Sequence, residues 1–326
     1  FYNMLRRILL HHSSLYFIAI PLMGFAMIYA VVPELQKPDA QCPAVLHLTF
    51  LNQWSAGRIP FSLLWSLPAA LIMLFLPMLT SRFTMFEKGM FLNSILWLLM
   101  LPAVMYFSGD LQVTIASLIV LPVYYFIFGM YKSEYPSHLF FNASLIISIA
   151  SLFYTPTLLM VLLLWMGWLF YNPFKPRAYL LSVTGVLLPY FFVFSYFFIF
   201  DGREHFEIPF RFISLSGIIG NTPFLVFMAG LAFMVLLGLI RLASPGAVKK
   251  VGLRKNMNFI LLAFVFFAAA LFITGEYSLL IFVIFPASVI VNYYFVHTIR
   301  SWVFLLMFLL FCGFMLYFPF SGDLFN

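Results

Sequence analysis

Residues 34–60 read ELQKPDAQCPAVLHLTFLNQWSAGRIP and form the longest stretch of this sequence that the interior of a bilayer would not accept. Long apolar runs flank the stretch on both sides, and most of the remaining chain is apolar as well. A helix that crosses a bilayer needs about 20 predominantly apolar residues. The flanking runs are therefore predicted to be membrane spans, and the stretch between them is predicted to be a loop on the water side.

The composition extends this interpretation to the whole chain. Of the 326 residues, 64% are hydrophobic and only 8% are charged, whereas a soluble domain carries about 25% charged residues. Because no polar segment is long enough for a separate soluble domain, residues 1–326 are predicted to form a single integral membrane domain. Cys42 and Cys312 have neither metal-ligand spacing nor a disulfide framework.

The apolar runs predict an all-α fold, a polytopic transmembrane helical bundle of about eleven spans. The short start at 1–13 is basic and amphipathic, and it is predicted to lie at the cytoplasmic surface. The predicted spans cover residues 14–34, 61–79, 90–107, 111–130, 139–155, 156–172, 179–200, 212–240, 257–275, 277–297 and 301–319.

The distribution of charge predicts the orientation of the bundle. With the N-terminus inside, alternate threading puts thirteen of the 17 lysine and arginine residues inside and eight of the ten acids outside. Cytoplasmic loops carry an excess of lysine and arginine, and the loop 241–256 alone supplies five. We therefore predict an N-inside, C-outside topology, in which the net charge of +7 follows membrane sidedness and does not indicate nucleic-acid binding.

Two substantial polar loops then lie outside: outer loop one (residues 35–60) and outer loop four (residues 201–211). Within outer loop one, residues 44–54 predict a helix lying flat in the interface, with Trp54 as an anchor. Leu46 and Phe50 share its apolar side, whereas Val45 falls on the polar side.

If the bundle brings outer loops one and four together, their charged residues would line one mouth. Arginine donates paired hydrogen bonds to phosphate oxygens, and a carboxylate can act as a base or hold a divalent cation. This combination suits a phosphate-bearing lipid substrate. The alternative is that these loops are hydrated and their charges simply pair. The candidate phosphate-binding residues are Arg58, Arg203, Arg211 and His205.

Glu34 and Asp39 are the candidate catalytic residues. Glu34 follows Pro33 at the end of the first span, where a half-desolvated carboxylate is suited to the role of base. Asp39 follows Pro38 in a wetter stretch, where it would stay ionised and could hold a divalent cation.

The spans themselves carry little chemistry. No acid, lysine or arginine lies at mid-depth in a predicted span, which argues against an ion-coupled pump. Ser144, Ser148 and Ser151 form a stripe of small residues on the span 139–155. Such a stripe predicts a packing face, with a ligand groove as the alternative.

Residues 140–198 resemble an uncharacterised polytopic inner-membrane family of Bacteroidota. The resemblance is carried by Phe-Asn-Ala at 141–143, Ala-Ser-Leu-Phe-Tyr at 150–154 and Asn-Pro-Phe at 172–174. It implies a multi-pass location in the bacterial inner (cytoplasmic) membrane and brings no activity with it.

The predicted topology alone also resembles that of the GT-C glycosyltransferases. These enzymes have a cytoplasmic N-terminus, a long first outer loop with an acid near its start, and a functional fourth outer loop. The resemblance implies a protein that handles a polyprenyl-phosphate-linked sugar at the outer face, with Glu34 and Asp39 in the place of the acid. The alternatives are a non-catalytic structural subunit associated with other membrane subunits and, third, a transporter without ion coupling.

Overall fold

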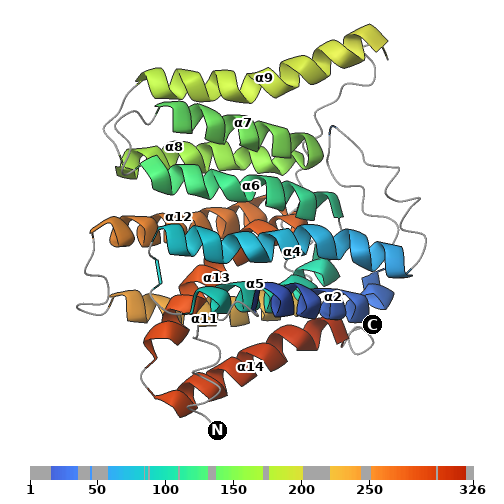
Figure 1. Cartoon of the computed structure of the whole chain (residues 1–326), viewed down its shortest axis with the longest axis vertical. Coiled ribbons are helices and arrows are strands. Elements are labelled where there is room, and N and C mark those ends of the chain that lie inside the picture. Colours follow the sequence, from blue (N-terminus) through green and yellow to red (C-terminus); the bar gives the residue numbers. More distant parts are fainter. Residues whose placement is uncertain are drawn as a thin grey trace. The chain divides into compact units, whose positions relative to one another are not determined.

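A computed structural model describes most of the chain, and every regular element that it describes is a helix. It contains eleven α-helices and two short 3-10 turns (Figure 1), which confirms the all-α prediction for the described part. The described residues are 16–35, 45, 58–83, 85–86, 89–108, 111–130, 137–171, 176–200, 221–243, 251–298 and 300–320.

Most helices follow the predicted spans closely, but the helix Thr222–Ala243 begins ten residues after the start of the predicted span 212–240. Seven of them are long and apolar enough to cross a membrane, and four shorter apolar helices accompany them in the described part. The α-helices are α2 (Tyr16–Leu35), α4 (Arg58–Arg82), α5 (Met90–Ser108), α6 (Leu111–Gly129), α7 (Ser137–Phe153), α8 (Leu159–Tyr171), α9 (Pro176–Phe200), α11 (Thr222–Ala243), α12 (Val251–Thr274), α13 (Leu280–His297) and α14 (Ser301–Phe320). The 3-10 turns are η2 (Thr155–Leu158) and η4 (Tyr277–Leu279).

The helices differ from the predicted spans around the basic loop predicted at 241–256. Helix α12 begins at Val251, six residues before the predicted span at 257, so Arg254 and Lys255 belong to its first turns. Long basic side chains can lie along an apolar surface while their charged ends stay in water. A helix can therefore continue past the apolar run that predicts it.

By their contacts, the residues divide into two compact units. Unit 1 comprises residues 1–40, 53–110 and 212–326, and unit 2 comprises residues 41–52 and 111–211. The prediction of one membrane domain stays a prediction, and the two units are described one at a time.

The core of unit 1 is built on α13 and α5. Residues 280–295 of α13 and 91–105 of α5 are all buried. Helix α13 packs against α5, α11 and α12, while α5 also packs against α2, α4 and α14. Side chains from every direction therefore cover these two helices.

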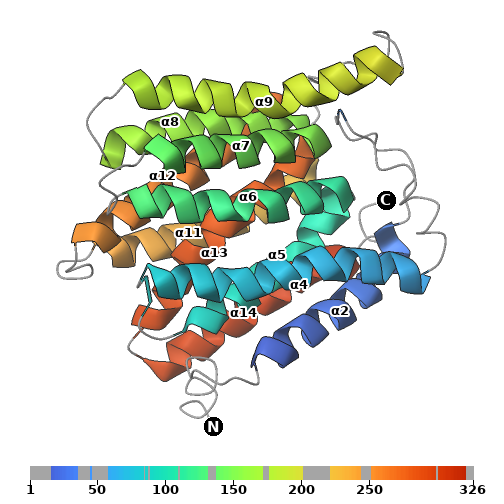
Figure 2. The same cartoon turned by 45° about the horizontal axis from the view of Figure 1, so that its top comes forward.

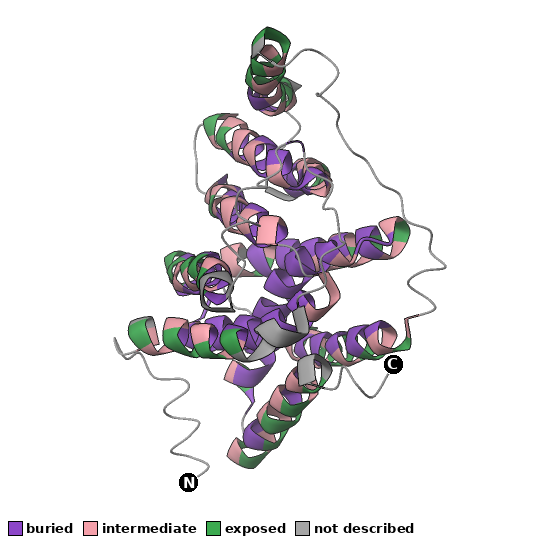
Figure 3. Cartoon of the chain, turned by 90° about the vertical axis from the view of Figure 1, so that its right-hand side faces the viewer, coloured by how far each residue is buried: buried purple, intermediate pink, exposed green. Residues whose placement is uncertain are grey.

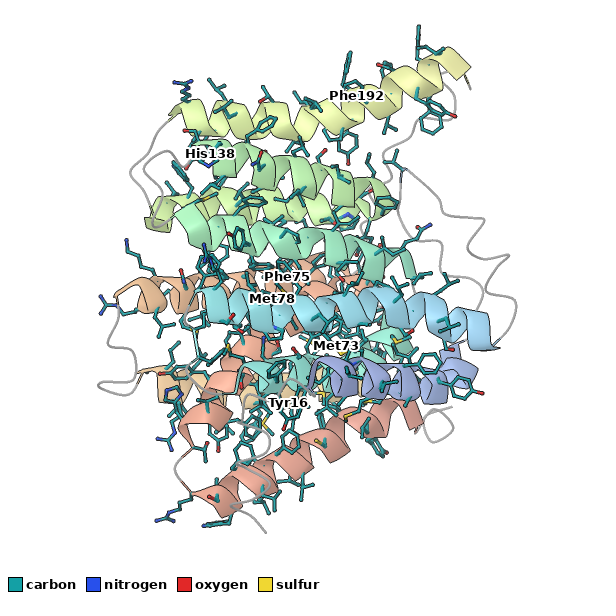
Figure 4. The ribbon with its side chains drawn as sticks, viewed as in Figure 1. Tyr16, Met73, Phe75, Met78, His138 and Phe192 are labelled. Carbon is teal, nitrogen blue, oxygen red and sulfur yellow. The ribbon has the colours of Figure 1, made fainter. Side chains whose placement is uncertain are left out.

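Two contacts connect α5 to neighbouring helices, and they involve Met73 and Tyr16, which are labelled in Figure 4. The Ser94 hydroxyl donates a hydrogen bond to the Met73 carbonyl oxygen of α4 at 2.8 Å. The ring of Tyr16 on α2 packs against that of Phe91, with their centroids 5.4 Å apart.

A third contact joins the two core helices at their ends. The side-chain nitrogen of Asn292 on α13 donates to the carbonyl oxygen of Gly89 at 3.1 Å. Gly89 precedes α5 and has a φ of 76°, a conformation that favours glycine. The bond ties the final turns of α13 to the beginning of α5.

Unit 2 is organised around α7, which packs against α6, α8 and α9 (Figures 1 and 2). The Ser148 hydroxyl donates to the Val186 carbonyl oxygen of α9 at 2.6 Å. An added Cβ on Gly185 would collide with the Ser144 hydroxyl oxygen. These contacts confirm that the serine stripe of α7 is a packing face.

Much of the surface of helix α9 is not covered by other described residues. Only 17% of its most apolar window is buried. In Figure 3, α9 is the uppermost helix, and most of it has the green and pink of exposed and intermediate residues. Phe192 is 62% exposed and is labelled on α9 in Figure 4. In a membrane, such a surface faces lipid or another apolar protein.

Candidate functional site

Two of the predicted site residues, Glu34 and Arg58, lie at the ends of neighbouring helices. Glu34 belongs to the last turn of α2, and Arg58 is the first residue of α4. The two helices pack against each other and run in opposite directions, with these ends on the same side (Figures 1 and 2). The backbones of one predicted acid and one predicted arginine therefore stand at the same end of one helix pair.

The other parts of the predicted mouth lie outside the described residues. This holds for the side chains of Glu34 and Arg58, for the interfacial helix predicted at 44–54 apart from Val45, and for outer loop four. It also holds for Asp39, Arg203, His205 and Arg211. The meeting of the two outer loops stays a prediction.

Within unit 2, the junction between α7 and α8 carries buried polar side chains. Thr155 and Thr157 of η2 are 0% and 1% exposed. Their hydroxyl oxygens have no hydrogen-bond partner among the described residues. Buried polar atoms are nearly always paired with protein, water or a ligand, and no described residue supplies that partner for these two hydroxyls.

Ser151 and Tyr190 add two more hydroxyls close to this junction. The Ser151 hydroxyl donates to the Ser148 carbonyl oxygen at 2.6 Å and lies 2.8 Å from the Tyr190 hydroxyl oxygen. Because the Ser151 proton is used by the carbonyl, the Tyr190 hydroxyl donates to Ser151. The lone pairs of the Tyr190 oxygen then remain as acceptors.

A residue from predicted outer loop one reaches the same junction. The backbone nitrogen of Val45 donates to the Leu152 carbonyl oxygen at 3.0 Å, and the Val45 side chain is buried at 9% exposure. In the predicted interfacial helix, Val45 is an apolar residue on the polar side. The burial of its side chain in unit 2 explains why this position is apolar.

We call Ser151, Thr155, Thr157 and Tyr190 the hydroxyl cluster. Its members are uncharged and can both donate and accept hydrogen bonds, and Ser151, Thr155 and Thr157 are enclosed by protein. The sequence analysis did not select Thr155, Thr157 or Tyr190 as site residues. The signal available was a group of hydroxyl residues around Pro156, at a predicted turn between two spans.

The described residues contain no group of three or more histidine, cysteine, aspartate or glutamate side chains that could hold a metal ion. The divalent cation predicted at Asp39 involves a residue outside this part of the chain. No chemical step is therefore assigned to a metal.

Comparisons with protein-family models, with curated proteins and with solved structures find no match to this chain. The class of protein is therefore inferred from the helices alone. Seven candidate spans among the described residues indicate a multi-pass, all-α membrane protein in a lipid bilayer.

Proposed function

We propose that this protein handles a polyprenyl-phosphate-linked sugar at the outer face of a bacterial inner membrane, as a GT-C-like enzyme would. The observation that carries the proposal is the shared end of α2 and α4, where the backbones of Glu34 and Arg58 stand on one side of a helix pair. Ends of membrane-spanning helices lie near the depth of lipid headgroups, where an acid and an arginine would meet the phosphate of a lipid-linked sugar.

The roles follow from the chemistry of these side chains. Glu34 would accept the proton of an acceptor hydroxyl whose oxygen bonds to the anomeric carbon of the sugar. The bond between that carbon and the phosphate oxygen would break, releasing polyprenyl phosphate. Arg58, with Arg203, Arg211 and His205 of outer loop four, would bind the phosphate.

The test is sugar transfer by the purified full chain in liposomes that contain a polyprenyl-phosphate-linked sugar. Glu34→Gln keeps the shape of the side chain and removes the base, so the transfer rate should fall by about 10²- to 10⁴-fold. Lys37→Gln, in the adjoining outer loop one, is the control and should retain the rate. If Glu34→Gln combined with Asp39→Asn leaves transfer unchanged, the catalytic role is wrong.

One observation favours a second candidate, a non-catalytic subunit of a larger inner-membrane complex. The exposed aromatic surface of α9 could pack against another membrane protein. A photo-reactive amino acid at Phe192 would then give discrete protein adducts in native membranes. Adducts with lipid alone, matching those from exposed Leu309 on α14, would count against the subunit role.

A further inference from the structure

Two buried asparagines occupy the junction between the core helices of unit 1. Asn93 on α5 and Asn292 on α13 are both 0% exposed. Among the described residues, no hydrogen-bond partner reaches the Oδ1 and Nδ2 atoms of Asn93 or the Oδ1 atom of Asn292. The Nδ2 of Asn292 is used, because it donates to the Gly89 carbonyl oxygen at 3.1 Å.

The Gly89 carbonyl brings the two asparagines together. Gly89 precedes the first residue of α5, so its carbonyl oxygen is the helical acceptor for the backbone N–H of Asn93, four residues later. A side chain four residues after a helical carbonyl lies on the same face of the helix. On α4, for example, the Thr80 hydroxyl oxygen is 3.0 Å from the Leu76 carbonyl oxygen. Asn93 and Asn292 therefore meet at one carbonyl group.

The surroundings offer no route to bulk water. Residues 91–105 of α5 and 280–295 of α13 are all buried, and a buried polar group without a partner costs its full desolvation penalty. The next residue, Ser94, avoids this cost, because its hydroxyl donates to the Met73 carbonyl oxygen of α4. The three atoms of Asn93 and Asn292 need a partner of another kind.

The numbers of donors and acceptors identify that partner. A direct bond from Nδ2 of Asn93 to Oδ1 of Asn292 would still leave Oδ1 of Asn93 without a donor. A cation would bind the two oxygens but not the Nδ2 donor. Water both donates and accepts, and an internal water typically makes about three hydrogen bonds to buried polar groups.

We propose that Asn93 and Asn292 bind internal water at the junction of α5 and α13. Water donates to the Oδ1 atoms of the two asparagines, and Nδ2 of Asn93 donates to the same water or to a second one. The bound water connects the final turns of α13 to the first turn of α5, in addition to the bond between Asn292 and Gly89. The inference goes beyond the proposed function and does not depend on it.

The direct test is a density map of the full chain in lipid nanodiscs, at a resolution that shows ordered water. We expect an isolated peak at about 2.7–3.2 Å from side-chain polar atoms of both Asn93 and Asn292. This measurement needs no variant, so a folding defect cannot obscure it. A map that shows the two side chains clearly and has no peak beside them would overturn the proposal.

A double-mutant cycle tests whether the water couples the two asparagines. Asn93→Leu and Asn292→Leu should each lower the unfolding temperature in detergent, because either change displaces the water and leaves polar atoms unpaired. The second change then has less to remove. The combined loss in the folding equilibrium constant should be about fivefold smaller than the product of the two single losses.

The control cycle combines Ser94→Ala with Asn292→Leu. The Ser94 hydroxyl is paired with α4, so these two losses should simply multiply. If the losses from Asn93→Leu and Asn292→Leu multiply as well, the two asparagines share no water and the proposal is wrong.

A change of salt separates water from a bound cation. The unfolding temperature of the original chain should be equal in sodium chloride, potassium chloride and choline chloride at the same ionic strength. A higher temperature in sodium or potassium chloride that disappears in Asn93→Leu would identify a cation site instead of a water site.

Discussion

At Gly185 the backbone of α9 approaches that of α7 closely. An added Cβ would stand 2.9 Å from the Phe141 carbonyl oxygen, besides colliding with the Ser144 hydroxyl. A backbone carbonyl cannot move aside as a flexible side chain can. Small residues at such positions allow membrane helices to pack closely.

Gly185→Ala should therefore destabilise unit 2. Overpacking of this kind typically costs about 1–3 kcal/mol, which a thermal or denaturant unfolding curve in detergent would detect. The matched control is Gly313→Ala on α14, where an added Cβ meets nothing within 4 Å. The control should be neutral or stabilising by up to about 1 kcal/mol through helix propensity, and equal losses in both variants would contradict the packing argument.

Polar residues inside the core show what sequence can and cannot reveal about single positions. The sequence contains Asn93 and Asn292 within apolar runs, but only the structure shows that Asn292 binds Gly89. Both side-chain polar atoms of Asn93 are buried without a partner among the described residues. Such pairings depend on contacts between distant parts of the chain, which no local pattern contains.

At the scale of elements, the sequence predicted where helices lie better than how they are surrounded. Apolar run length predicts a span because the thickness of the hydrocarbon layer sets it. The windows of Tyr277–His297 and Arg177–Ile199 have mean hydropathies of 2.2 and 1.8, yet 94% of the first is buried and 17% of the second. Lipid and protein interior are both apolar, so hydropathy cannot distinguish a central helix from a peripheral one.

The α7–α9 pair offers a measurement of one interhelical hydrogen bond. A double-mutant cycle with Ser151→Ala and Tyr190→Phe should give a coupling free energy of about 0.6 kcal/mol, the mean for such bonds between membrane helices. The Thr184 hydroxyl instead binds the Leu181 carbonyl oxygen of its own helix. A cycle of Ser151→Ala with Thr184→Ala should give no coupling, and similar values for the two cycles would exclude a specific bond.

At the scale of the whole molecule, sidedness rests on the charge distribution and can be tested with thiol reagents. In a variant without Cys42 and Cys312, a cysteine at Ala247 should react only after the membrane is opened, because the basic residues around it resist translocation. Retaining Cys42 alone should give labelling from the outside. Labelling at position 247 by an impermeant reagent in intact cells would overturn the predicted threading.

The candidate site was less predictable than the bundle. The positions of Glu34 and Arg58 follow from span boundaries, which apolar run length sets. The hydroxyl cluster depends instead on how the α7–α8 turn packs, and outer loop four contributes no described residue. A mouth built from two loops depends on their folded approach, which composition and periodicity do not encode.

The division into two units has a consequence for biogenesis. Apart from residues 41–52, unit 2 is one continuous segment, 111–211, whereas unit 1 needs segments from both sides of it. During synthesis, the helices of unit 2 can associate while the ribosome is still translating the later ones. Unit 1 must wait for α13, its most enclosed helix, so α2, α4 and α5 remain without their central partner in the bilayer. An unfinished bundle exposes apolar surface of the kind that chaperones cover, so the order of translation is expected to affect how this protein reaches its fold.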